Sequence, residues 1–169
     1  GVENWAVYSA YSHPTVPQNY LLTLDNNSAA GLNSTRWNNT APTNAVFSVG
    51  ASQAVNASAN TYIAYCFHSV PGYSKVGSYT GTGAAGNKVD TGFEPAFIMI
   101  KRTDGVQDWW IVDNKTSTTS SEFDKYLEAN TTGTTFTPGA NINIHIDGFS
   151  FDGVSFNNSN QDFIYIAFA

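Results

Sequence analysis

The side chains that could do chemistry in this chain are few and scattered. There are three histidines, His13, His68 and His145, and a serine nucleophile would need one of them together with an orienting carboxylate. None of the three lies in a local pattern that supplies such partners. The acidic residues mostly occupy turns or the segment 122–128, so the sequence sets up no carboxylate pair for glycoside hydrolysis. The sequence therefore predicts that the protein is not an enzyme.

Metal and thiol chemistry have equally little support. Hard oxygen ligands, which Ca²⁺ prefers, occur in loops at Asp25 to Asn27 and at Asp113 and Asn114. The spacing of an EF-hand is missing, and Asx-turns explain the same residues without a metal. We therefore expect no cofactor, with calcium as the alternative. Cys66 is the single cysteine, which excludes an intrachain disulfide, and its apolar neighbours predict a thiol buried in the core.

Composition narrows the classes of partner. Charged residues make up only 12% of the chain, and the net charge is −6 with seven lysines and arginines, which argues against nucleic acid. No hydrophobic segment of bilayer length is visible, so we expect no membrane partner. Aromatic residues reach 14%, a content that indicates a folded chain.

Aromatic residues supply the remaining candidate contacts. Trp110 and Tyr11 could stack on sugar rings if they are exposed, and the polar loop residues Asp113 and Asn114 could contribute hydrogen bonds. Adjacent Trp109 and Trp110 point to opposite faces of a strand, so at most one of them faces a given core. Trp5 and Trp109 occupy equivalent places in a repeat, which predicts a shared core position and leaves Trp110 as the exposed contact.

That repeat is the most informative feature of the sequence. Residues of 55–67 recur about 100 positions later, in 156–168, and similar pairs link 47–49 with 149–151 and 4–7 with 108–111. The segment 73–103 has no counterpart before Trp5. We therefore predict two related units, a partial first repeat at 1–70 and a complete second repeat at 71–169, in a chain that begins partway through a repeat.

The pattern of residue types predicts an all-β protein. No stretch of twelve or more residues keeps helical spacing, whereas short runs of branched and aromatic residues recur between turn residues. The expected strands are 5–8, 20–24, 45–49, 61–67, 75–79, 96–101, 109–112, 142–146, 149–151 and 163–168. This arrangement is typical of an antiparallel β-sandwich made of two related repeat units, the first incomplete.

Some strands and turns can be described further. The segments 61–67 and 163–168 are apolar on both faces, which predicts central strands covered on both sides. The alternation in 142–146 places three isoleucines toward a core and His145 toward the surface. Tight turns with a positive backbone dihedral are expected at the Asp-Gly pairs 104–105, 147–148 and 152–153, and a flexible loop is expected at 80–86.

Several phrases of the sequence resemble a known family. They are TYIAYCF (61–67), SKVGSYTG (74–81), GFEPAFIMIKRT (92–103), WNNTAPT (37–43) and FIYIAF (163–168). Together they are similar to the β-rich repeat domain of unknown function found in structural proteins of tailed bacteriophages, especially marine ones. The resemblance covers almost the whole chain. It implies a capsid decoration, head fibre or tail fibre on the surface of the virion, and it brings no catalytic residues.

The leading hypothesis is therefore a non-enzymatic virion structural module. Such a module would assemble with itself, as a homo-oligomer, and with other virion proteins through sheet edges and aromatic patches. The alternative is a carbohydrate-binding adhesin that recognises host surface glycans through residues such as Trp110 or Tyr11.

Overall fold

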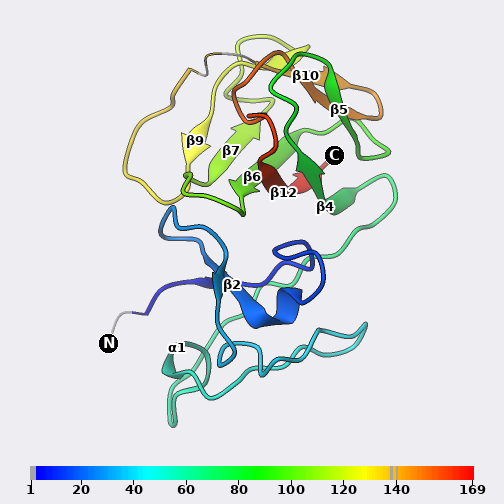
Figure 1. Cartoon of the computed structure of the whole chain (residues 1–169). Helices are drawn as coiled ribbons and strands as arrows, with labels where there is room; N and C mark the ends of the chain where they lie inside the picture. Colours follow the sequence, from blue (N-terminus) through cyan, green and yellow to red (C-terminus); the bar gives the residue numbers. More distant parts are fainter. Residues whose placement is uncertain (1–2, 138, 140) are drawn as a thin grey trace.

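The computed structural model describes residues 3–137, 139 and 141–169, and strands dominate this part of the chain (Figure 1). The elements in chain order are β1 (Ala6–Val7), η1 (Pro17–Asn19), β2 (Tyr20–Thr23), β3 (Gly31–Leu32), α1 (Gln53–Asn56), β4 (Ser74–Thr80), β5 (Asn87–Asp90), β6 (Phe97–Arg102), β7 (Trp110–Asp113), β8 (Glu122–Phe123), β9 (Leu127–Glu128), β10 (Ile142–His145), β11 (Gly148–Phe151) and β12 (Asp162–Phe168).

Two sheets of the second unit form an antiparallel β-sandwich. One sheet has the strand order β5-β11-β10-β8 and the other has the order β4-β12-β6-β7-β9. Every pairing between neighbouring strands is antiparallel. The core between the sheets contains Ile98, Phe123, Ile142, Phe149 and Phe151, all fully buried. The predicted all-β sandwich class is confirmed.

Strand β12 lies in the interior of the five-stranded sheet, between β4 and β6, and is buried on both faces. Phe163, Tyr165 and Ala167 point into the sandwich core. Ile164, which points the other way because side chains alternate along a strand, belongs to a second apolar cluster. The prediction of a central strand covered on both sides is confirmed for this segment.

The second apolar cluster joins the first unit to the outer face of the five-stranded sheet. Leu22 and Val7, from the small sheet β1-β2-β3, pack with Trp109, Ile164 and Met99. The indole nitrogen of Trp109 also donates a hydrogen bond of 2.7 Å to the carbonyl oxygen of Thr23. In Figure 1 the first unit, blue to cyan, lies below the sandwich, green to red.

The strands β1 and β2 reproduce the strands β7 and β9 of the second unit. Val7 pairs with Leu22, and their repeat counterparts Ile111 and Leu127 pair in the same way. Ile111 lies directly opposite Met99, on the outer face of the five-stranded sheet. The two units therefore meet through the same face, since Val7 and Leu22 pack against that outer face.

The hydrogen bonds beside these strands are repeated as well. The amide of Trp5 donates to the Asp25 carboxylate at 3.2 Å, and the amide of Trp109 donates to the Asn130 side chain at 2.8 Å. The carbonyl oxygens of Trp5 and Trp109 accept from equivalent residues on the neighbouring strands. The repeat seen in the sequence is thus a repeat of local structure in this region.

The predictions of strands at 45–49 and 61–67 are wrong. Both segments lie outside every strand and are mostly exposed. The reason is visible in the second unit, where β12 is the counterpart of 61–67 and takes both of its neighbours, β4 and β6, from residues 74–102. The 169 residues contain no second copy of that segment, so 61–67 has no strand to pair with.

Three predictions about the burial of side chains are wrong. Two of them, at Cys66 and Trp5, fail because the first unit lacks the partner strands that bury the counterparts of these residues. Cys66 is exposed, although its counterpart Ala167 is fully buried, and Trp5 is 51% exposed where Trp109 is buried. Ile146 is 83% exposed because β10 ends at His145, and the isoleucine lies in the hairpin turn. His145 is partly buried and lies on the outer face of its sheet.

The chain turns or bends at the three Asp-Gly pairs, but the predicted positive dihedral is absent from all three. In the β10–β11 hairpin His145 pairs with Gly148, so the loop consists of Ile146 and Asp147. Gly148 belongs to the extended strand, where a Cβ atom would meet the carbonyl oxygen of Val89. Close approach of two strands, rather than backbone dihedral, requires glycine there.

The loop at 80–86, predicted to be flexible, is anchored by Asn157. The buried side chain of Asn157 accepts a hydrogen bond from the Thr82 amide at 3.0 Å and donates one to the Ala84 carbonyl at 2.8 Å. It also accepts from Asn87 at 2.7 Å and donates to Gly153 at 2.9 Å. Asn157 therefore ties the stretch 82–87 to residues 153–157.

Lys101 is a fully buried cation at the contact between the two units. Its ammonium donates hydrogen bonds to the carbonyl oxygens of Arg102, at 2.8 Å, and of Asn27, at 3.3 Å. Burial removes water from the charged form and lowers the pKa of Lys101 to about 8. At neutral pH the folded protein therefore carries the cost of a desolvated charge.

We expect Lys101→Met to raise the free energy of unfolding at pH 7 and to flatten its dependence on alkaline pH. Because the folded pKa is below the unfolded value, the unfolded chain binds more protons between about pH 8 and 10.5. The stability of the unmodified chain should therefore rise with pH, by about 2 kcal/mol at pH 9.5. Urea titrations from pH 7 to 9.5 measure this. Lys115→Met, at an exposed site, should keep the rise, and a rise that persists in Lys101→Met would contradict the assignment.

Candidate assembly surface

Residues 61–67 present an unpaired, apolar stretch of backbone. Within the part of the chain that the structure describes, these residues make no backbone hydrogen bond to another segment. Ile63, Tyr65 and Phe67 are 64%, 67% and 61% exposed. A row of free amides and carbonyls beside large apolar side chains is a template for pairing with another strand.

A second exposed apolar stretch lies at residues 46–49. Phe47 and Val49 are exposed, whereas their counterparts in the second unit, Phe149 and Phe151, are fully buried in the sandwich core. The chain turns just before this stretch, where the Thr43 amide donates to the Val46 carbonyl oxygen at 2.8 Å. Phe47 and Val49 are therefore residues of the type found in the core, but no sheet among the described residues covers them.

Aromatic contacts connect residues 61–67 to both units. Tyr65 stacks on Trp5, with ring centroids 6.3 Å apart. Phe67 packs edge-on against Phe168, its own repeat counterpart, at 5.9 Å, and Tyr73 contacts the same ring at 6.0 Å. We define the assembly surface as residues 46–49 and 61–67 with Trp5, Tyr73 and Phe168.

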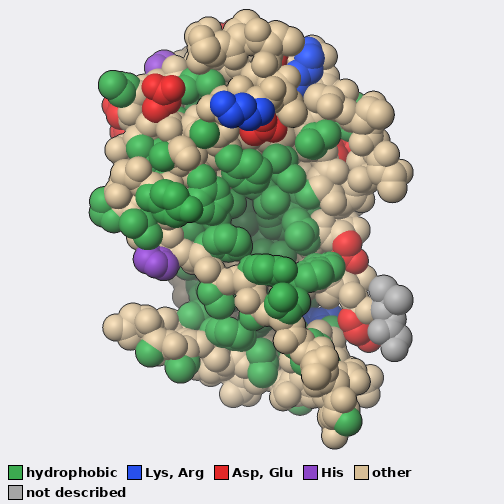
Figure 2. Space-filling view, turned by 180° about the vertical axis from the view of Figure 1, so that it is seen from behind, with side chains coloured by type: hydrophobic (Ala, Val, Ile, Leu, Met, Phe, Trp, Pro, Cys, Tyr) green, Lys and Arg blue, Asp and Glu red, His purple; other side chains and the backbone are tan. Residues whose placement is uncertain are grey.

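Hydrophobic side chains gather on one side of the molecule (Figure 2). In that view they cover the middle of the molecule, from the sandwich toward the first unit, and the surface is hollowed between them. Charged side chains in this view lie mostly above the hydrophobic area and to its right. Large apolar patches of this kind mark interaction surfaces in soluble proteins.

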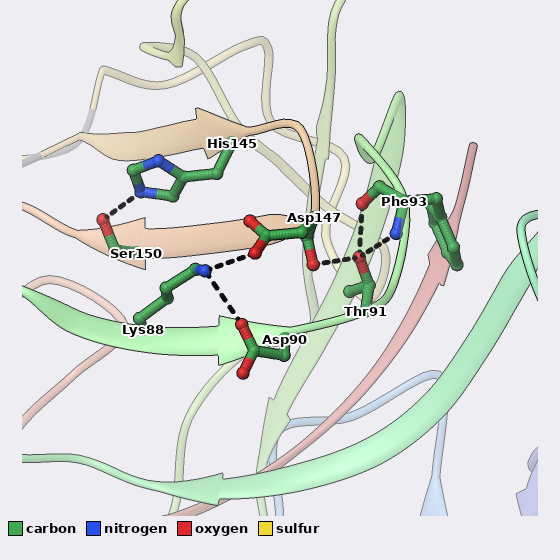
Figure 3. Close-up of polar contacts among 7 residues, drawn as sticks. All are labelled: Lys88, Asp90, Thr91, Phe93, His145, Asp147 and Ser150. Carbon is green, nitrogen blue, oxygen red and sulfur yellow. Dashed lines mark hydrogen bonds and ion pairs between the residues drawn. The ribbon is translucent and has the colours of Figure 1, made fainter.

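The outer face of the four-stranded sheet is polar by contrast (Figure 3). The ammonium of Lys88 lies 2.7 Å from Asp147 and 3.0 Å from Asp90, and its hydrogen bond lowers the pKa of the Asp147 carboxyl. His145 Nε2 lies 2.8 Å from the Ser150 hydroxyl. This sheet has the polar outer face of an antiparallel sheet that meets water on one side.

The pair of His145 and Ser150 was missed by sequence reasoning. Alternation along the two strands of the hairpin puts both side chains on one face, and this signal was available in the sequence. No carboxylate among the described residues hydrogen-bonds the other ring nitrogen of His145, and the Ser150 side chain is buried. The pair therefore lacks the orienting carboxylate of a nucleophilic triad.

The predicted contact residues are not brought together. The prediction that Trp110 is exposed is wrong, because the indole is only 8% exposed and packs against Phe156 at 4.4 Å between the two sheets. Asp113 lies on the opposite face of β7, and its carboxylate accepts the amides of Lys115 and Thr116, both at 2.8 Å, in an Asx-turn. Asn114 is exposed beside it.

Tyr11 is exposed, as a surface contact requires, and lies in the loop after β1. Of the loop residues considered for calcium, Asp25 accepts the Trp5 amide, and Asn26 accepts the Ser28 amide. The described residues contain no group of three or more histidine, cysteine or carboxylate side chains placed to hold a metal ion.

One edge of Trp110 reaches a surface pocket of about 260 Å³. Its lining combines aromatic rings with neutral polar groups: Gln107, Trp110, Tyr126, Thr137, Gly139, Val154, Ser155, Phe156 and Asn158. Phe156, one of the pocket residues, has a positive φ of 59°, which is unusual for a bulky residue. The hydroxyl of Tyr79 donates a 2.6 Å hydrogen bond to the Phe156 carbonyl oxygen and fixes this backbone conformation. Burial raises the pKa of Tyr79 well above its usual value.

The structure is an antiparallel β-sandwich with a smaller three-stranded sheet beside it, and it exposes the segment 61–67, whose sequence resembles the interior strand β12. The chain belongs to the family described as Domain of unknown function (DUF7483), whose model matches residues 1–169. No curated protein and no solved structure matches the chain. Among the described residues, no helix is both long enough and apolar enough to cross a bilayer.

Proposed function

We propose that this protein is a non-enzymatic structural module that assembles with copies of itself and with other proteins of a virion. The observation that carries the proposal is the unpaired segment 61–67. Its sequence resembles that of β12, an interior strand of the sandwich, yet among the described residues its backbone pairs with no other segment, and its side chains are exposed. Such a segment gains hydrogen bonds and apolar burial only when another chain or segment pairs with it.

The distribution of polarity over the molecule supports the same proposal. The outer face of the four-stranded sheet carries Lys88, His145 and Ser150 and suits contact with water. The assembly surface carries Trp5, Tyr65 and Phe67 instead. Aromatic residues of this kind dominate the binding energy of protein interfaces.

The proposed location of the module rests on the resemblance of its sequence to a known family. The phrases quoted from the sequence resemble a repeat domain of tailed-phage virion proteins, so the surface of a virion is the proposed location, as a capsid decoration, head fibre or tail fibre. The low share of charged residues is compatible with a module that is packed against others over much of its surface.

The proposal is tested by sedimentation of the purified chain over a range of concentrations. We expect species larger than the 18.2 kDa monomer to appear as concentration rises. Tyr65→Asp should suppress them, because a carboxylate in a desolvated strand contact is costly. Ile146→Asp, at an exposed hairpin turn outside the defined assembly surface, is the matched control and should assemble like the unmodified chain. A strictly monomeric chain, or equal assembly by both variants, would count against the proposal.

The pocket beside Trp110 favours one second candidate, the binding of host surface glycans. Neutral polar groups next to aromatic rings suit saccharides, whose hydroxyls need hydrogen bonds and whose ring faces are apolar. Screening against a glycan array tests this candidate. Binding that is lost in Gln107→Ala and kept in Asn114→Ala would support it, whereas absence of saturable binding would eliminate it.

A further inference from the structure

We infer that the assembly surface is completed by a strand segment of the type of residues 73–103, supplied by another repeat of the same kind, so that the first unit becomes a full sandwich. The inference rests on the proposed function and names the partner of its surface. It follows from three independent comparisons between the complete unit and the partial one.

The strand order of the complete unit fixes where the missing strands belong. In the second unit β12 lies between β4 and β6, and β6 in turn pairs with β7. The counterparts of β12 and β7 in the first unit are residues 61–67 and β1. By the same strand order, the equivalent of β6 would lie between residues 61–67 and β1, and the equivalent of β4 would lie on the far side of 61–67.

The turn before the unpaired segment already has the conformation that receives such strands. The Asn60 amide donates to the Ala57 carbonyl at 3.3 Å, as the Gln161 amide donates to the Asn158 carbonyl at 3.2 Å. The residues at the equivalent place, Ala59 and Asn160, both have positive φ, 63° and 58°.

In the complete unit this turn is bonded to the segment that the first unit lacks. The Asn160 amide donates to the Gly81 carbonyl at 2.9 Å, and the Gly81 amide donates to the Gln161 carbonyl at 2.8 Å. No equivalent bonds are made by Ala59 and Asn60 among the described residues. The turn of the first unit thus has the conformation of its counterpart, and its backbone groups at Ala59 and Asn60 do not make the bonds to a partner segment that the complete unit makes.

A side-chain comparison leads to the same partner. Asn157 bonds to Thr82, Ala84 and Asn87, all within the 73–103 segment. Within the described part of the chain, its counterpart Asn56 makes one side-chain hydrogen bond, a donation to the Gly50 carbonyl at 3.1 Å. The carboxamide oxygen of Asn56, like the thiol of Cys66, occupies a position that the complete unit buries.

The occupant is a separate segment and not residues 73–103 of the same chain. Those residues are already paired with β12 over seven positions in β4 and six in β6. The sequence also shows how such a segment would be joined. Residues 1–5, GVENW, match residues 105–109, GVQDW, so a copy of 71–104 placed directly before Gly1 has the loop length of the complete unit.

The experiment uses the full chain with and without a second copy of residues 71–104 placed before Gly1. The readout is the rate at which the thiol of Cys66 reacts with a disulfide reagent under native conditions. Cys66 is the only cysteine and is exposed, whereas its counterpart Ala167 is fully buried. We expect the extension to slow the reaction on the order of 100-fold or more, because access would then require local unfolding of a paired strand.

A chain extended by the same residues in shuffled order is the matched control and should react like the original. Equal reactivity in the native and shuffled extensions would overturn the inference. Protection of Cys66 in oligomers of the unextended chain, without any added segment, would also overturn it while leaving the proposed function standing. Protection by the native extension, in a protein whose unextended form never assembles, would uphold the inference and remove the proposed function.

Discussion

Replacing Asn157 by alanine is expected to lower the free energy of unfolding by about 4 kcal/mol, a large share of the stability of a domain of this size. The carboxamide is fully buried and makes hydrogen bonds to Thr82, Ala84, Asn87 and Gly153. Alanine would leave two donors and two acceptors without their partner in a space that a methyl group does not fill. Denaturation by urea, followed by tryptophan fluorescence, measures the loss.

Asn56→Ala is the matched control for this change, because Asn56 is the repeat counterpart of Asn157. Among the described residues it makes a single side-chain hydrogen bond, and it is exposed, so its loss should cost about 1 kcal/mol or less. Equal effects of the two substitutions would show that the hydrogen bonds to the 80–87 segment do not stabilise the sandwich. In the chain extended by residues 71–104, the Asn56 substitution should become as costly as the other.

The second large effect is expected at the contact between the two units. Trp109→Ala should lower the free energy of unfolding by about 3–5 kcal/mol, the range for removal of a buried tryptophan. The indole is 4% exposed, packs with Leu22 and Ile164, and donates a hydrogen bond to Thr23. Its removal should loosen the first unit from the sheet, so amide exchange in β1 and β2 should accelerate more than exchange in β12.

Two variants separate the sources of this effect. Trp109→Phe keeps most of the apolar contact and removes the hydrogen bond to Thr23, so it should cost about 1–2 kcal/mol. Trp5→Ala removes the exposed counterpart and should cost less than 1 kcal/mol. A loss at Trp5 as large as the loss at Trp109 would mean that the two tryptophans have equivalent surroundings, contrary to the packing described here.

The sequence predicts the second unit well because that unit contains all the partners of its own strands. Branched and aromatic runs at β4, β6 and β12 form strands where expected, and β12 is covered on both faces as its composition predicts. The identical reasoning fails at 61–67, since a strand pattern describes a segment that fits between neighbours and does not supply them. Whether neighbouring strands are present depends on the rest of the chain and not on the segment itself.

The candidate contact residues show the same limit of prediction from sequence. Alternation correctly separated Trp109 and Trp110 onto opposite faces of a strand, but it could not show that both faces of this sheet are covered. Each indole therefore lies in a different apolar cluster, and neither is free to stack on a sugar. Exposure of Cys66 and Tyr65 was equally inaccessible, because their counterparts Ala167 and Ile166 lie in a completed strand.

The contact between Phe67 and its counterpart Phe168 joins equivalent residues of the two units, but the units do not meet symmetrically. An isologous contact is reciprocal, so the counterpart of each contact residue makes the same contact. Here Trp109 is buried between the units, whereas its counterpart Trp5 is 51% exposed. The proposed assembly through residues 61–67 would join two unlike surfaces, an open strand and a donated one. A heterologous contact of this kind leaves the same pair of surfaces available on the next copy, so it would allow growth beyond a pair.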